Sequence, residues 1–239
     1  MVMSLTRILQ VYIIQGAVCL FFFFIGYKII KRNRKKRLNQ IFALYFLIVA
    51  ASLVINFFYA PIEDPNLQEL ARILNIFTIY FIVLSMAFLL IFIMIVNKSE
   101  KIINTRKQIL IILIYAAILS VLFFIPPPYG AKVEILPDGT QLAPVWGLGF
   151  VIYTLTIIGI TIGITYRLCV VVFFKFEDKS LQKKWRFFTL GMCFFWYVAI
   201  GTCINNFLDN ETFRLVFGLT GIVIVVGAYL VYYGVGKQV

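Results

Sequence analysis

The side chains that most often carry chemistry are scarce in this sequence. It contains no histidine, which removes the commonest metal ligand and the usual acid–base group near neutral pH. No aspartate or glutamate lies inside any of the long apolar stretches, and no CxxC motif occurs. The four cysteines all lie within or at the ends of these stretches, namely Cys19, Cys169, Cys193 and Cys203. We therefore expect neither an enzyme nor a bound metal or cofactor.

Neutral amides and two arginines gather at one end of the apolar stretches. These residues are Gln15, Asn56, Arg72, Asn75, Asn205 and Arg214. Tyr59, Tyr80 and Trp146 lie at a similar depth. A few convergent polar groups between aromatic walls are typical of sites for small ligands. The pattern therefore predicts a ligand-binding cup, formed by these six residues, at this end of the molecule.

The same six residues also have an interpretation without a ligand. Amides near helix ends form hydrogen bonds across helices in membrane proteins. Arg72 and Arg214 each have an acid nearby in the sequence, Glu69 and Glu211, with which an ion pair could form. Both interpretations remain open from the sequence.

Seven apolar stretches must hold these residues in place. The chain is 62% hydrophobic and 13% charged, with a mean hydropathy of +0.98. In a soluble domain about half of the residues are apolar and about a quarter are charged. Each stretch has the length of a helix that crosses a hydrocarbon core of roughly 30 Å. The predicted spans are residues 8–30, 41–60, 73–96, 108–126, 147–172, 187–208 and 214–235. The sequence predicts an all-α membrane protein, a single seven-transmembrane-helix bundle over residues 1–239.

The charges of the loops predict which way the bundle faces. The loops after the first, third, fifth and seventh spans, with the adjoining span ends, carry 18 lysines and arginines and three acids. The opposite side carries four basic residues and seven acids. Because lysine and arginine are enriched in cytoplasmic loops, we expect the N-terminus outside the cell and the C-terminus in the cytoplasm. The expected location is the plasma membrane.

Two basic segments on the expected cytoplasmic side are candidates for contact with other molecules. They contribute Arg32, Arg34, Lys35, Lys36, Arg37, Lys183 and Lys184. Basic residues beside a span attract anionic lipid headgroups, and the run at 31–37 also offers a contact for an acidic cytoplasmic partner. A pI near 9.6 can indicate nucleic-acid binding as well. Since these charges flank membrane spans, we expect no nucleic-acid partner.

The loop at residues 127–146 is the external segment with a recognisable pattern. The prolines at 126–128 end the fourth span, because proline has no N–H with which to continue a helix. Two extended runs, AKVEIL and TQLAPV, flank the turn sequence Pro137-Asp138-Gly139. We predict a β-hairpin that caps the external face; a simple connector is the alternative.

Four segments resemble one known family along nearly the whole chain. They are Arg37–Leu44 (RLNQIFAL), Glu69–Asn75 (ELARILN), Lys183–Gly191 (KKWRFFTLG) and Gly227–Tyr233 (GAYLVYY). Together with the order of the loops, they are similar to the seven-transmembrane sensor domain at the N-terminus of many prokaryotic sensor histidine kinases and diguanylate cyclases. In that family a linker and a catalytic domain follow the last span, whereas here only Gly234–Val239 follow. The resemblance therefore implies a stand-alone sensor that lacks the kinase.

Three functions remain open from the sequence. The first is a receptor-like sensor module that binds an external or membrane-borne ligand and signals through a separate cytoplasmic partner. The second is a non-catalytic structural subunit of a larger membrane complex. The third is a small-molecule carrier. Coupled transporters usually have a carboxylate or a broken helix at mid-membrane, and the sequence predicts neither, which makes the carrier the least favoured.

Overall fold

Apolar runs without internal prolines form the long helices of this protein. The described prolines lie in connections, in a strand or at the start of a short helical turn. A computed structural model describes residues 8–62, 64–135, 142–208 and 210–236. Within these residues, seven helices are long and apolar enough to cross a membrane, which confirms the predicted all-α polytopic class. Which membrane holds them stays a prediction.

Several of the seven spans are composed of more than one helical segment. The segments are η1 (Ile8–Gln15, π-helical) with α2 (Gly16–Arg32); α3 (Arg37–Tyr59); η2 (Pro65–Leu67) with α4 (Gln68–Lys98); α5 (Thr105–Ser120) with η3 (Val121–Phe124); α6 (Leu148–Lys175); α7 (Lys179–Leu208); and α8 (Glu211–Thr220), α9 (Val223–Val231) and η4 (Tyr232–Gly236, π-helical). Two boundaries differ clearly from the sequence prediction. Helix α4 begins five residues before position 73, and α7 begins eight residues before position 187. In both places polar residues continue the helix beyond the apolar stretch.

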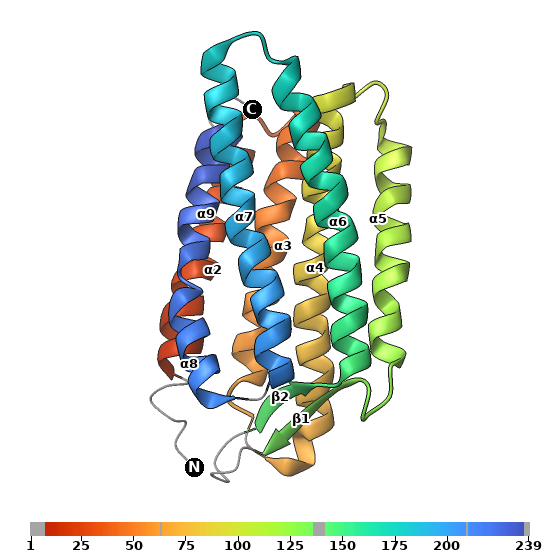
Figure 1. The fold of residues 1–239 in the computed structure, drawn as a ribbon, viewed down its shortest axis with the longest axis vertical. Helices are drawn as coiled ribbons and strands as arrows, with labels where there is room; N and C mark the ends of the chain where they lie inside the picture. The colour runs from red at the N-terminus through yellow and green to blue at the C-terminus, as the bar shows by residue number, and fades with distance from the viewer. Residues whose placement is uncertain (1–7, 63, 136–141, 209, 237–239) are drawn as a thin grey trace.

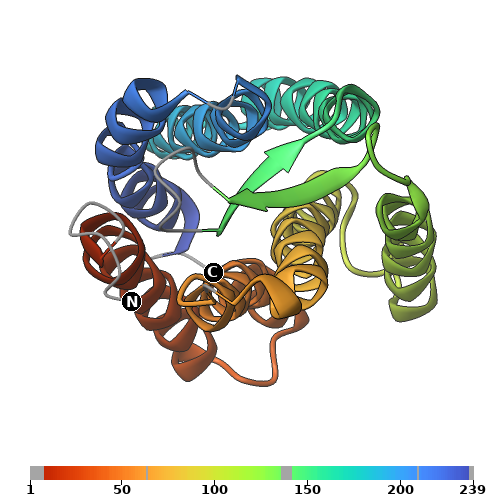
Figure 2. The same ribbon diagram turned by 90° about the horizontal axis from the view of Figure 1, so that it is seen from below.

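The spans form a ring, with α5 outside it. Viewed from the end that carries the strands, α2, α3, α4, α6, α7 and the α8–α9 span follow one another around a central space (Figure 2). Neighbouring members of the ring are in contact, and α2 closes it against α9. Helix α5 lies against α4 on the outside of the ring.

The connections separate into two ends (Figure 1). The α2–α3, α4–α5 and α6–α7 connections lie at one end, called the basic end because it carries most of the lysines and arginines. The α3–α4 connection, the strands and the α7–α8 connection lie at the other, called the hairpin end. The assignment of the basic end to the cytoplasm stays a prediction.

Two antiparallel strands, β1 (Ala131–Ile135) and β2 (Leu142–Trp146), form where the sequence predicts a hairpin. Their register pairs Ala131 with Trp146 and Ile135 with Leu142. The predicted turn at Pro137–Gly139 lies outside the described residues. Figure 2 shows the strands lying across the end of the ring. A Cβ atom on Gly147 would lie 2.1 Å from the carbonyl oxygen of Pro128, so glycine is required where the hairpin leads into α6.

The seventh span is interrupted near its middle, contrary to the expectation of no broken helix. Helix α8 ends at Thr220 and α9 begins at Val223. The N–H of Gly221 still donates to the carbonyl of Phe217, four residues back, at 2.8 Å. The N–H of Ile224 instead donates to Gly221, three residues back, at 3.1 Å. The interruption is therefore one tight turn at a glycine, the residue other than proline least favourable in a helix interior.

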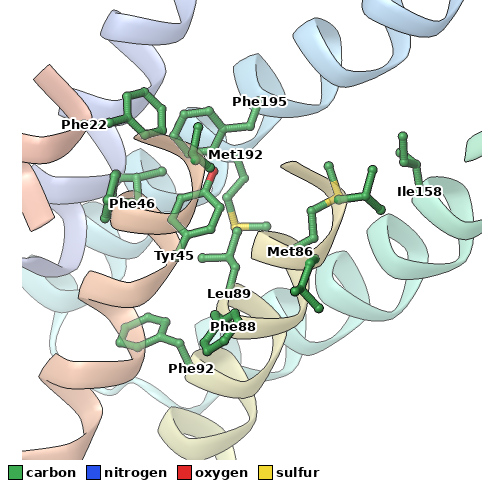
Figure 3. Close-up of a cluster of buried hydrophobic side chains, with 14 of the residues drawn as sticks. Phe22, Tyr45, Phe46, Met86, Phe88, Leu89, Phe92, Ile158, Met192 and Phe195 are labelled. Carbon is green, nitrogen blue, oxygen red and sulfur yellow. The ribbon is translucent and has the colours of Figure 1, made fainter. Parts of the chain in front are cut away.

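Aromatic side chains fill the basic-end half of the ring. Phe42, Phe46, Phe92 and Phe188 have no exposed surface. The rings of Phe42 and Phe92 stack with centroids 4.3 Å apart, and Trp185 stacks on Phe188 at 4.7 Å. Figure 3 shows Phe42's neighbours Phe46 and Phe92 within this cluster. This half of the bundle is a packed core rather than a pore.

Candidate functional site

A cavity of about 680 Å³ occupies the hairpin-end half of the ring. Side chains of η1, α2, α3, α4, α6, α7, α8, α9 and β2 line it, so every span except the one outside the ring contributes. Its volume lies within the roughly 300–1,000 Å³ of cavities that bind small molecules. Among the described residues, no three of the cysteines and acids lie close enough together to hold a metal ion.

Five of the six residues that the sequence predicts for a ligand-binding cup line this one cavity. They are Gln15, Asn56, Asn75, Asn205 and Arg214. The structure therefore brings together side chains from the first, second, third, sixth and seventh spans. That they bind a ligand stays a prediction.

Arg72 is the exception and requires a correction. Its guanidinium donates to both carboxylate oxygens of Glu69, with Nε–Oε2 at 2.7 Å and Nη2–Oε1 at 2.5 Å, and it does not line the cavity. The two residues are three apart on α4, a spacing at which helical side chains meet. For this arginine the ion-pair interpretation holds.

A buried relay of hydrogen bonds joins the hairpin to two helices. The indole N–H of Trp146 donates to Oδ1 of Asn75 at 3.1 Å, and Nδ2 of Asn75 donates to the hydroxyl of Tyr59 at 2.9 Å. All three side chains are buried and line the cavity. Asn75 therefore uses both ends of its amide to connect β2 with α4 and α3.

The amide of Asn56 is also engaged within the protein. Its Nδ2 donates to Oε1 of Gln15, so these two predicted cup residues join the first and second spans. This contact is the kind of interhelical hydrogen bond that the ligand-free interpretation requires. Gln15 and Asn56 hence have a structural role, whether or not a ligand also contacts them.

Arg214 connects α8 to its two neighbours at the hairpin end. Its Nη2 donates to the carbonyl of Pro144 in β2 at 3.0 Å, and its own carbonyl accepts from Nε2 of Gln10 in η1 at 3.3 Å. The sequence also offers Glu211 as a partner for this arginine, but that side chain lies outside what the structure describes.

Two polar atoms in the cavity wall have no hydrogen-bond partner among the described residues. They are Oδ1 of Asn205 on α7 and Oγ1 of Thr154 on α6. Thr154 is fully buried, and a helical threonine usually bonds to the carbonyl one turn back. The sequence does not single out Thr154, because that usual bond would use its one donor and such threonines are common in helices.

The cavity ends at an aromatic floor about halfway along the bundle. Phe22, Tyr45 and Phe195 line it, with ring centroids of Tyr45 and Phe195 5.5 Å apart and of Phe22 and Phe195 5.7 Å apart. Figure 3 shows these rings converging, with Met86 and Ile158 on the opposite wall. Apolar side chains therefore surround the deep part of the cavity, and polar ones surround its hairpin end.

The basic residues proposed for lipid or partner contact differ in availability. Those of the α2–α3 turn are exposed: Arg32, Arg34, Lys35 and Lys36. Lys183 on α7 is exposed and Lys184 is partly buried. Arg37 is partly buried, and its Nε donates to Oε1 of Gln108 on α5 at 2.6 Å, so it helps to position α5.

Comparison with known proteins does not name a family for this chain. No protein-family model matches the sequence, and a search of the curated proteins finds no significant match. The resemblance to seven-transmembrane sensor domains therefore remains an expectation from the four sequence segments.

Proposed function

We propose that this chain is a receptor-like sensor module that binds a small ligand in the hairpin-end cavity and signals through a separate partner at the basic end. The observation that carries the proposal is the convergence of Asn75, Asn205 and Arg214, from three separate spans, on one cavity of about 680 Å³. A cavity with polar side chains on several walls and an apolar deep part is suited to holding one small molecule in a defined orientation.

The aromatic floor of the cavity favours the interpretation as a receptor rather than as a pore. On the basic-end side of this floor, Phe46, Phe92 and Phe188 are fully buried. In the proposed topology, the N-terminus and the hairpin face the outside of the plasma membrane. The exposed basic turn at Arg34–Lys36 then faces the cytoplasm, where it can contact anionic lipid and an acidic effector.

The experiment is a thermal-unfolding screen of small molecules on the purified protein in nanodiscs. A ligand at about 100 times its Kd stabilises the folded state by about 2.7 kcal/mol. Thr202→Phe, which places a ring in the cavity, is expected to abolish the shift, whereas Thr156→Phe, on the exposed face of α6, should retain it. A shift that survives Thr202→Phe would locate binding elsewhere. Pull-downs with and without the ligand then test whether binding changes association with an effector.

A carrier is the second candidate, and the interruption of the seventh span favours it. Gly221, at the turn between α8 and α9, lines the cavity. Broken helices beside a central site are common in transporters. Flux of the screened ligand into proteoliposomes would support a carrier, while binding without flux would support the receptor.

A further inference from the structure

The unpartnered atoms of the cavity restrict the chemistry of a ligand, and this inference rests on the proposed function. Oδ1 of Asn205 is an acceptor, so the group that satisfies it must donate a hydrogen bond. Oγ1 of Thr154 can donate or accept. A hydroxyl or amide group on the ligand meets both needs, whereas a carboxylate, which only accepts, leaves the Asn205 oxygen unsatisfied.

The remainder of the wall requires an apolar body. Below the level of Thr154 and Asn205 the described lining residues are mainly apolar, down to Phe22, Tyr45 and Phe195. No carboxylate lies among the described lining residues, and the guanidinium of Arg214 donates to the hairpin carbonyl of Pro144. A charged group in that deep part would lie away from Arg214, which is at the hairpin end, and would be desolvated without an opposite charge.

The seam between η1 and α8 forms one side wall of the cavity. Leu215 lines the cavity in this wall and is 39% exposed. Gln10 fills the seam: its Nε2 would lie 2.8 Å from a Cβ on Gly218, and it donates to the carbonyl of Arg214 at 3.3 Å. Ile13 beside it is 59% exposed and faces the surroundings of the ring.

The hairpin, by contrast, closes the end of the ring that points away from the membrane core. Gln68 donates to the carbonyl of Val133, and Trp146 and Arg214 add two further hydrogen bonds between the hairpin and the helices. Displacement of the Gln10 side chain from Gly218 would widen the seam between η1 and α8.

We infer that the cavity takes a neutral, mainly apolar molecule dissolved in the bilayer, bearing a hydroxyl or amide group, and that this molecule enters between η1 and α8. Its polar group lies between Asn205 and Thr154. Its apolar body extends toward the aromatic floor.

The test uses photolabelling of the full chain in nanodiscs with three diazirine probes: a long-chain alcohol, the carboxylate of the same length, and a short water-soluble alcohol. Labelled peptides are identified by mass spectrometry. The long-chain alcohol should label residues of the cavity wall, and the carboxylate should label them weakly. Thr154→Val, which keeps the shape but removes the hydroxyl, is expected to lower labelling about five- to tenfold.

A disulfide across the seam tests the route. A Cβ on Gly218 would lie 3.2 Å from Cγ of Gln10, the position that the sulfur of a cysteine at residue 10 would take, so the two cysteines are close enough to form a disulfide. The Gln10→Cys, Gly218→Cys double variant should lose most of its labelling when oxidised and regain it on reduction, which makes the same protein its own control.

Several outcomes would overturn the inference. Unchanged labelling in the oxidised double variant would reject the route, and equal labelling by the carboxylate would reject the neutral class. Labelling by the water-soluble probe alone would reject a membrane-borne ligand while leaving a ligand cavity in place. If no probe labels the cavity but the thermal screen finds a ligand whose stabilising shift is lost in Thr202→Phe, this inference fails and the proposed function stands. If the screen also finds no such ligand, the inference and the proposed function both fail.

Discussion

Asn75 holds Trp146 and Tyr59 at the two ends of one buried amide, and this contact fixes the hairpin on the ring. Asn75→Leu would remove the acceptor of the buried indole N–H and one donor to the phenol oxygen. Each unsatisfied buried group costs about 1–3 kcal/mol. We expect Asn75→Leu to lower the free energy of unfolding in detergent by that order.

A double-mutant cycle with Trp146→Phe separates the hydrogen bond from general packing. Trp146→Phe removes the same N–H, so the double variant should lose clearly less stability than the sum of the two single variants. Additivity to within about 0.3–0.5 kcal/mol would show that the two side chains stabilise the protein independently.

The contact of α7 with α9 depends on a pair of glycines. A Cβ on Gly191 would lie 2.6 Å from the carbonyl oxygen of Gly227, a backbone atom that cannot move without moving the helix. Small residues at such positions let membrane helices approach closely. We expect Gly191→Ala to lower the unfolding midpoint measurably and to disturb the position of α9.

Gly159→Ala is the matched control for that substitution. A Cβ on Gly159 meets nothing within 4 Å. Alanine is favoured over glycine in a helix by about 1 kcal/mol, so this variant should be neutral or slightly more stable. Equal losses in the two variants would contradict the packing explanation.

The ion pair of Arg72 with Glu69 lies outside the cavity, and its partner is largely exposed. Exposed ion pairs contribute about 0–1 kcal/mol. Arg72→Ala should therefore change stability little and leave the affinity of any cavity ligand unchanged, whereas Asn205→Ala should weaken binding. Titration of both variants with the same ligand is the measurement. Equal losses of affinity would return Arg72 to the site.

The direction of the bundle is testable by chemical labelling of single introduced cysteines. In intact cells, Tyr129→Cys at the hairpin end should react with a membrane-impermeant maleimide, whereas Lys35→Cys at the basic end should react only after permeabilisation. Both positions are exposed. The reverse pattern would place the hairpin in the cytoplasm.

The seven spans could be predicted from the sequence because continuous apolar runs leave a membrane helix as the main option. Helix α7 was harder to delimit. Its first residues, from Lys179, are polar and continue the helix beyond the membrane-length stretch. The turn at Gly221 was not predictable, since glycine is frequent in unbroken membrane helices as well.

The cavity illustrates a second limit of the sequence. Depth along each span placed Asn75 and Asn205 at the same end, and both line the same cavity in the structure. The position of Arg72 along its span is similar to theirs, so depth could not separate it from them. The direction of its side chain is set by the ion pair with Glu69, one turn away. Thr154 is identified only by a missing partner, which is a property of the folded protein.

The fully buried phenylalanines Phe42, Phe46, Phe92 and Phe188 also make the basic-end half of the bundle an electrical insulator. An ion crossing it would shed its hydration at a cost of at least several kcal/mol. If water fills the opposite half, most of the membrane voltage falls across this thinner layer. The cavity can then exchange its contents without short-circuiting the membrane, and a molecule within it experiences little of the field.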